Sequence, residues 1–174
     1  MADAITKAEL LDKLREGEKS LVDQLSKLPA TAFDGGVYEN GWNGRQILAH
    51  IAAIEWTYPK LIDVAKSPPA PKPAATEKPK TDLPTRAAGG GIDSYNDRSI
   101  SRYADKSAQE LLEIFRENRK TTIATIEAED DAVFAMPVKS AGGITGPLAN
   151  VINMVAIMHV SGHVNDIVKG SQAG

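Results

Sequence analysis

The sequence predicts an all-α protein, a four-helix bundle with a long Pro/Gly-rich connection between the second and third long helices. Two observations lead to this fold class. Apolar residues recur at intervals of three and four over four long stretches, which is the period of a helix with one buried face. Little of the chain shows the alternation that indicates strands. Connected helices of about 20 residues bury their apolar faces best against one another, so a bundle is expected.

Length and composition indicate one globular domain over residues 1–174. Of the 174 residues, 42% are hydrophobic and 25% charged, and the formal net charge is −3. Basic residues are interspersed with acidic ones, so the sequence lacks the basic patch typical of nucleic-acid binding. It also lacks an uninterrupted apolar run that would span a membrane, and its start lacks the features of a signal peptide. We therefore expect a cytoplasmic protein without nucleic-acid or membrane partners.

The first helix should start after Thr6, because Thr6 and Glu9 have the spacing of a capping box. Its apolar stripe contains Leu10, Leu14, Gly17, Leu21, Leu25 and Leu28. Pro29 should end this helix. Glycines then predict a loop over residues 30–41.

The second helix should begin at Gly44, with Asn43 as N-cap and Gln46 as its reciprocal partner. Its buried stripe contains Ile47, His50, Ile51, Ile54, Tyr58 and Leu61. The pattern continues to Ala65. We expect a kink at Pro59, because proline lacks a backbone donor and clashes with the preceding turn.

Residues 67–91 form the Pro/Gly-rich connection, with six prolines before three consecutive glycines. Such a composition cannot bury a core, so an extended surface segment is expected. It could cover the mouth of a site or act as a spacer, and both alternatives stay open. A short helix over residues 92–103 follows it.

The third long helix should start after Ser107, which has capping-box spacing with Glu110. Its stripe contains Leu111, Phe115, Asn118, Thr122 and Ile126. The helix ends in the acidic residues 127–131. A loop over residues 134–143 follows, with a short extended piece at 133–138.

The last helix should cover residues 148–168. Residues 145–147 start it, with Pro147 in the first turn, where a missing amide donor costs nothing. Gly170 ends it. Its buried stripe contains Leu148, Ile152, Val155, His159, His163 and Ile167. The two histidines are four residues apart, so they should lie one above the other on the inward face.

These stacked imidazoles have the arrangement of half a metal site. His50, the only other histidine, lies on the buried stripe of the second helix. Three imidazoles that face one core could bind an ion and leave further positions open, as catalytic sites do. Such a ligand set suits zinc, nickel, iron and copper.

A metal-free explanation stays open. Histidines four residues apart also occur as hydrogen-bonded core pairs or in solvated patches. Against this explanation, each unpaired buried imidazole N–H costs about 1–3 kcal/mol. Cysteine is absent, which excludes disulfides, thiolate ligands and a cysteine nucleophile.

Trp42 to His50 resembles the start of the second helix in the DinB-like superfamily of metal-binding four-helix bundles, where a tryptophan, a polar cap and a terminal histidine recur. His159 and His163 resemble the His-x-x-x-His of its fourth helix. The resemblance covers nearly the whole chain. It implies that the three histidines bind one divalent ion, most often zinc or nickel.

Tyr95 and Asn96, followed by the Ser107 cap, are similar to the third-helix entry of one branch of this superfamily. That branch contains the amino-terminal domain of mycothiol-dependent maleylpyruvate isomerases and the colibactin self-resistance type proteins. Members of the superfamily transfer or add low-molecular-weight thiols, isomerise small acids or hydrolyse reactive electrophiles. The sequence has no counterpart of the isomerases' carboxy-terminal domain, so their particular substrate is not expected.

Four residues are candidates for a substrate pocket outside the ligand set. Trp42 should pack on Ile47 as a hydrophobic staple and would also border the pocket. Asn96, Arg98 and Arg102 could hold an anionic substrate. Helix caps and surface ion pairs are the alternative roles of these three residues.

Two more candidates flank His163. Gly162 would leave space beside the ion, or would permit a close contact between helices. Asp166 could orient the His163 ring from outside the ligand set, or could be an ordinary polar residue near a helix end. No residue is a convincing general base.

Three functions follow from these patterns. In the first, a divalent ion lowers the pKa of water or of a thiol, and the enzyme hydrolyses a small electrophile or transfers a low-molecular-weight thiol to it. In the second, the same pocket sequesters a small molecule without turnover. In the third, the histidines only pack inside a structural module, such as a homodimer. The sequence favours the first, and any sulfur nucleophile must then come from a cosubstrate.

Overall fold

The computed structural model describes residues 5–35, 41–67 and 91–172. Residues 68–90, most of the predicted Pro/Gly-rich connection, lie outside this range, so the two roles considered for that connection stay predictions. The main helices are α1 (Lys7–Leu25), α2 (Gly44–Glu55), α3 (Tyr58–Lys66), α4 (Gly91–Arg102) and α5 (Ala108–Ala128). The last helix consists of α6 (Leu148–Ile152), η4 (Asn153–Met158) and α7 (His159–Gln172). Shorter elements are η1 (Ala30–Phe33), η3 (Asp131–Ala135), β1 (Pro137–Lys139) and β2 (Thr145–Pro147).

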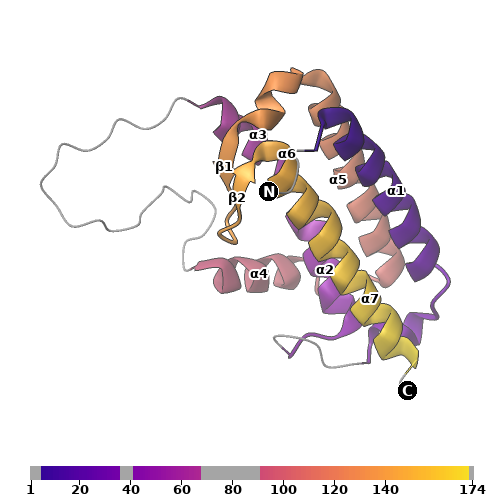
Figure 1. Cartoon of the computed structure of the whole chain (residues 1–174). Coiled ribbons are helices and arrows are strands. Elements are labelled where there is room, and N and C mark those ends of the chain that lie inside the picture. The colour runs from indigo at the N-terminus through magenta and orange to yellow at the C-terminus, as the bar shows by residue number, and fades with distance from the viewer. Residues whose placement is uncertain (1–4, 36–40, 68–90, 173–174) are drawn as a thin grey trace, which may run out of the picture.

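Four long helical segments form a bundle, which confirms the predicted all-α fold class. α5 packs against both α1 and α2, and α7 packs against the same two helices, so the four segments form a closed ring. α4 lies across one end of α2 (Figure 1). Inside the ring, one apolar cluster surrounds Phe33, Leu48 and Phe115. A second cluster, around Leu10 and Phe134, lies beneath the β1–β2 hairpin.

All three predicted capping boxes are present. Thr6 with Glu9 starts α1, Asn43 with Gln46 starts α2, and Ser107 with Glu110 starts α5. In each box the side chain before the helix accepts from an amide of the first turn, and the residue three positions later reaches back. These boxes fix where three of the four bundle helices begin.

Replacing Asn43 with alanine is expected to lower the free energy of unfolding by about 1 kcal/mol. Asn43 Oδ1 accepts from the Gln46 amide at 2.9 Å, and the Asn43 amide donates to Gln46 Oε1 at 2.9 Å. Urea denaturation measures the change. Thr121→Ala, at an exposed position within α5, is the control and should leave stability unchanged or slightly higher. Equal stabilities of the Asn43 variant and wild type would contradict the role of the cap.

The first two predicted helices end differently from prediction. α1 ends at Leu25 with Ser26 as its C-cap, so Leu28 packs on the core from beyond the helix. The second predicted helix is interrupted rather than kinked, because α2 ends at Glu55 and α3 starts at Tyr58. Pro59 falls in the first turn of α3, where the missing donor is tolerated.

The region before the last helix is partly extended. Residues 145–147 form β2 and do not start the helix, and β2 pairs antiparallel with β1, with Pro137 opposite Pro147. The predicted extended piece at 133–138 overlaps β1 only at its end, because the short helix η3 runs to Ala135. Pro147 directly precedes the first helical residue, and the helix continues past Gly170 to Gln172.

The last helix contains one wide turn, which changes which side chains are buried. η4 is a π-helix, and the His159 amide donates to the carbonyl of Met154, five residues earlier. A π-turn adds about one residue to the helical repeat, so the buried positions move by one. From η4 onward, the buried residues are Ala156, Val160, Val164 and Ile167. The first three lie one position after the predicted stripe. The prediction that both histidines lie on the inward face is therefore wrong, since His159 is exposed and His163 half-buried.

By length and composition alone, the segment Leu148–Gln172 could cross a membrane. Its position in the bundle gives another reason for its apolar character, because α7 packs between α1 and α2. Core helices of soluble bundles can have the same length and apolar composition as a membrane-spanning helix. The expected absence of a membrane partner stays a prediction.

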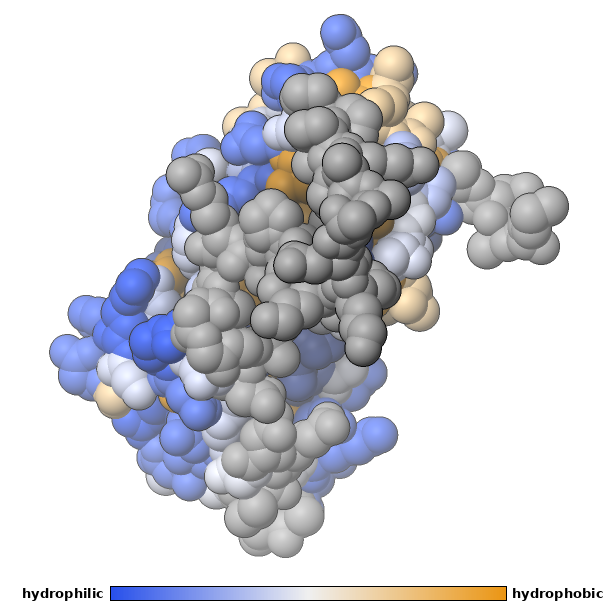
Figure 2. All heavy atoms as spheres, turned by 90° about the vertical axis from the view of Figure 1, so that its left-hand side faces the viewer, coloured by the Kyte–Doolittle hydropathy of each residue, from blue (hydrophilic) through white to orange (hydrophobic). Residues whose placement is uncertain are grey.

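Figure 2 shows the side of the molecule that carries α3, β1 and α4, where the visible surface is mostly hydrophilic. Five large apolar side chains are exposed in the described part of the chain: Trp56, Val64, Met136, Met154 and Met158. Scattered exposed apolar residues are normal for a folded protein. They therefore do not define a docking surface.

Candidate metal centre

Three imidazoles meet at the edge of the bundle, between α2 and α7. His50 Nε2 lies 3.5 Å from His159 Nε2, and His163 Nε2 lies 3.1 Å from His159 Nε2. One ring nitrogen from each histidine lies within 4.8 Å of the other two. The rings meet nearly edge to face, at interplanar angles of 80° to 86°. The structure thus brings together all three histidines that the sequence singled out.

The spacing of these nitrogens fits coordination of a single ion. Zinc–imidazole bonds of about 2.0–2.1 Å place the corners of a tetrahedron about 3.3–3.4 Å apart. The two nitrogen separations of 3.1 and 3.5 Å lie on either side of that range. His50 is buried, whereas His159 is exposed, so the open side of the cluster is towards solvent. The arrangement fits a three-histidine site with room for an external ligand.

Burial keeps two of the imidazoles neutral. Burial, together with smaller contributions from the neighbouring His163 and His159, lowers the pKa of His50 to about 3. Burial also lowers the pKa of His163 to about 4, with a second contribution from His159. Neutral imidazole is the form that binds metal ions. At neutral pH, protons therefore do not compete for these two rings.

The metal-free protein is expected to lose stability as the pH falls from about 6.5 towards 4. The folded-state pKa values of about 3 for His50 and about 4 for His163 lie below the ordinary histidine value. The unfolded chain therefore binds more protons than the folded protein between these pKa values and about pH 6.5. The stability that comes from burying the two neutral imidazoles is fully present only above about pH 6.5. Urea denaturation of chelator-treated protein between pH 4 and 8 measures the slope.

The double variant His50→Gln, His163→Gln serves as the control for this pH dependence. Carboxylates titrate in the same interval in both proteins, so the difference between the two slopes isolates the histidines. A shallower slope is expected for the variant. Equal slopes would contradict the statement that the fold favours the neutral imidazoles.

His50 is enclosed by the bundle. Trp42 is buried, and its ring centroid lies 5.2 Å from that of His50. Trp42 and Ile47 belong to the same buried apolar cluster, as expected for a hydrophobic staple. His50 Nδ1 is buried and has no hydrogen-bond partner among the described residues. Packing against Trp42, together with the turn of α2, therefore fixes the direction of this ring.

The other candidate residues outside the ligand set lie on α4 and α7. Asn96 is half-buried, and Arg98 and Arg102 are exposed, all on α4, which packs against the His50 helix. Their roles in holding a substrate stay predictions. Asp166 is exposed, and its charge raises the pKa of His163, opposing the effect of burial. That Asp166 orients the His163 ring stays a prediction.

Gly162 does not permit a close helix contact, so that alternative is wrong. A Cβ atom added there would meet no other atom within 4 Å. Gly162 is exposed between the two α7 histidines, so its missing side chain leaves open space on this surface. The π-turn, which places the histidine pair at the edge of the bundle, was not predicted. The sequence does contain a sign of it, because Ala156, Val160 and Val164 form a second apolar stripe one position after the expected one.

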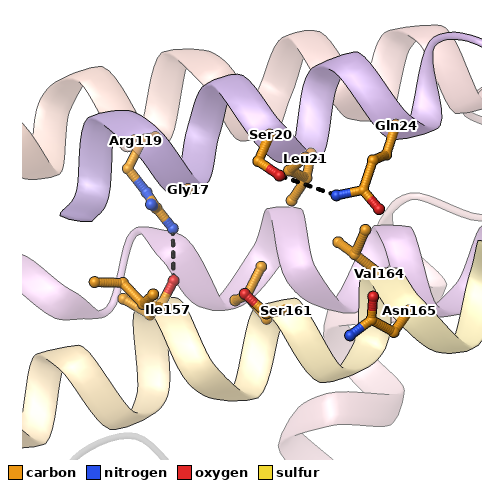
Figure 3. A pocket seen from close by; sticks show the side chains of 11 residues that line it. Gly17, Ser20, Leu21, Gln24, Arg119, Ile157, Ser161, Val164 and Asn165 are labelled. Carbon is orange, nitrogen blue, oxygen red and sulfur yellow. Dashed lines mark hydrogen bonds between the residues drawn. The ribbon is translucent and has the colours of Figure 1, made fainter.

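A hollow of about 50 Å³ lies elsewhere, between α1 and α7. Its walls include Leu21, Gln24, Ser161 and Val164 (Figure 3). The three histidines are not among the described residues that line it. This hollow and the histidine cluster thus occupy different sides of α7.

A four-helix bundle with a three-histidine cluster between its second and fourth long helices is what the resemblance to the DinB-like superfamily implies, and the comparisons place the chain in that superfamily. Residues 14–156 match the family described as the mycothiol maleylpyruvate isomerase N-terminal domain, and the chain belongs to this family. The matched region contains His50 and ends before His159 and His163. No curated protein matches the chain.

Two solved structures share the fold. They are the mycothiol-dependent maleylpyruvate isomerase and a histidine-to-alanine mutant of it, at 18% and 17% sequence identity, each with a TM-score of 0.67. Each alignment covers 94% of this chain and 61% of the solved chain. The chain thus spans about three fifths of the proteins it resembles. At this identity, the likeness establishes the fold alone.

Proposed function

We propose that this chain is a divalent-metal-dependent enzyme that joins a low-molecular-weight thiol to a small electrophilic substrate. The observation that carries the proposal is the convergence of three imidazole nitrogens, two of them 3.1 Å apart, at a solvent-facing edge of the bundle. The family's description names mycothiol, so mycothiol is the thiol we propose. Zinc and nickel are the ions we expect.

The chain's residues support this chemistry in three ways. His50 and His163 stay neutral at physiological pH, so their ring nitrogens can bind an ion. The cluster is open at His159 and Gly162, so a thiol and a substrate can approach. When bound, the ion would supply the positive charge that favours a thiolate over a thiol. Because the sequence has no cysteine, the sulfur must come from the cosubstrate.

The test is conjugation of mycothiol to chlorodinitrobenzene, measured by absorbance with zinc or nickel present. The thiolate sulfur forms a bond to the ring carbon, chloride leaves, and the thiol proton passes to solvent. The proposal predicts a rate above background that disappears with chelator and in the triple variant His50→Ala, His159→Ala, His163→Ala. An α,β-unsaturated acid as second electrophile tests addition in place of substitution.

The other outcomes of this assay decide among the alternatives. Metal-dependent consumption of the electrophile without thiol would support hydrolysis. Binding of the electrophile without turnover would support sequestration. Equal rates for the triple variant and wild type would contradict any role for the histidines. Cytoplasmic location and a homodimer stay predictions.

A further inference from the structure

A buried ion pair crosses the bundle between α5 and α2. Arg119 is 1% exposed and Glu55 is 0% exposed. Arg119 Nε donates to Glu55 Oε1 at 2.5 Å, and Nη2 donates to Glu55 Oε2 at 2.9 Å, so the pair is bidentate. Such a pair gives little net stability compared with apolar residues of similar volume, because both charges lose their hydration. Its geometry therefore suggests a role other than stability.

The remaining contacts of Arg119 lead to the last helix. Nη1 donates to the carbonyl of Leu14 on α1 at 3.1 Å, and Nη2 donates to the carbonyl of Ala156 at 2.8 Å. Figure 3 shows the Arg119 side chain reaching past Gly17 to the helix that carries Ile157 and Ser161. One side chain thus connects α5, α2, α1 and the π-turn.

A second buried side chain, Tyr58, bonds to the π-turn at the residue before Ala156. The Tyr58 hydroxyl donates to the carbonyl of Val155 at 2.9 Å. In a regular α-helix, amides four residues later bond to such carbonyls. Within η4, the bonds run over five residues, as from the amide of His159 to Met154. Arg119 and Tyr58 therefore bond to two adjacent carbonyls inside the segment where the regular ladder is interrupted.

The alternative to the π-turn is a regular helix continued from Leu148. Its apolar stripe would contain Val155, His159 and His163, as the unbroken spacing predicts. In the structure, Ala156 and Val160 are buried, and the histidine pair lies at the edge, beside His50. The π-turn thus determines which way the two histidines point.

We propose that Arg119, held by Glu55, and Tyr58 are positioning residues for His159 and His163, because they fix the π-turn that turns both rings towards His50. In treating the three histidines as a metal site, this inference rests on the proposed function. The stabilisation of the π-turn itself does not depend on a metal and can be measured without one.

The central variant is the double replacement Glu55→Leu, Arg119→Met, which removes both charges and leaves none unpaired. It should unfold at a urea concentration equal to or above that of wild type. In the metal-free protein, amide exchange over residues 154–160 should become at least about tenfold faster. The affinity for cobalt(II), followed by its visible absorption, should fall by about tenfold or more. Tyr58→Phe removes one bond and should change both quantities in the same direction.

Two controls separate positioning from general stability. Arg15→Met with Glu127→Leu removes an exposed ion pair between α1 and the end of α5, with side chains 48% and 49% exposed, and should change neither quantity. Leu25→Ala, at a buried position of α1, lowers stability without touching the π-turn. If Leu25→Ala alters exchange at 154–160 and cobalt affinity as much as the double variant does, the inference is overturned.

The metal-free exchange data decide the inference in every case. Unchanged exchange at residues 154–160 in the double variant would overturn it. If the double variant does not fold, unchanged exchange in Tyr58→Phe would overturn it. If wild type binds no cobalt, the proposed function fails, whereas accelerated exchange in the variants would still support the positioning of the π-turn.

Discussion

Replacing His159 with alanine is expected to reduce metal affinity by more than about 100-fold while the bundle stays folded. Residues that only orient metal ligands are worth about 10–100-fold, so a ligand should be worth more. His159 Nε2 lies near both other imidazoles, at 3.1 Å from His163 Nε2 and 3.5 Å from His50 Nε2. Its side chain is exposed, so truncation leaves no cavity in the core. Cobalt(II) titration measures affinity, and circular dichroism checks the fold.

Asn165→Ala is the matched control, because Asn165 is also exposed on α7 but borders the hollow against α1. It should bind cobalt as wild type does. Retained affinity in His159→Ala would mean that this histidine is not a ligand. Equal losses in both variants would point to a general effect on α7.

Replacing Arg119 alone with methionine is expected to cost about 3–5 kcal/mol of folding free energy. The change leaves the Glu55 carboxylate buried without its partner, whereas the double variant removes both charges. Burial raises the pKa of Glu55, and the Arg119 charge opposes this rise. Without Arg119, the pKa of Glu55 should rise further, so acid should lessen the cost as the carboxyl takes up a proton. Urea denaturation at pH 5 and pH 8 measures both effects.

Arg15→Met is the control for a single loss of charge, since the Arg15–Glu127 pair is about half exposed. Its cost should be at most about 1 kcal/mol. A cost of that size for Arg119→Met would contradict the view that Glu55 depends on Arg119. So small a cost would also argue against the proposal that the Arg119–Glu55 pair stabilises the π-turn.

The helix starts were predictable from sequence because they depend on local chemistry. Thr6, Asn43 and Ser107 each form a capping box with the residue three positions later. Both partners lie within four residues, so no knowledge of the tertiary fold is needed. The four apolar stripes likewise predicted the bundle, since their period is a property of the helix itself.

The orientation of the histidine pair was not predictable in the same way. Counting every three or four residues from Leu148 assumes a regular helix, and η4 breaks that assumption. The bonds to its carbonyls come from Tyr58 and Arg119, which lie 97 and 37 residues away along the chain. Such contacts exist only in the folded bundle. The three histidines nevertheless meet, although the prediction placed all of them on inward faces, because the π-turn moves His159 and His163 only to the edge of the bundle, where they still lie beside His50.

The buried ion pair was also missed, although the sequence carried a signal for it. The third long helix was predicted to bury Asn118, and the structure buries Arg119 and leaves Asn118 half-buried. Arg119 lies four residues after Phe115 and three before Thr122, on the same stripe. A charge on a buried stripe requires a partner of opposite charge. Glu55, at the end of the apolar helix α2, supplies it.

The metal content of the purified protein tests the central claim most directly. The protein should be prepared without affinity tag or chelator, and elemental analysis should be run beside the triple variant His50→Ala, His159→Ala, His163→Ala. We predict close to one equivalent of zinc or nickel in the parent and none in the variant. Absence of metal from the parent, even after addition of zinc or nickel and gel filtration, would contradict a metal-dependent enzyme.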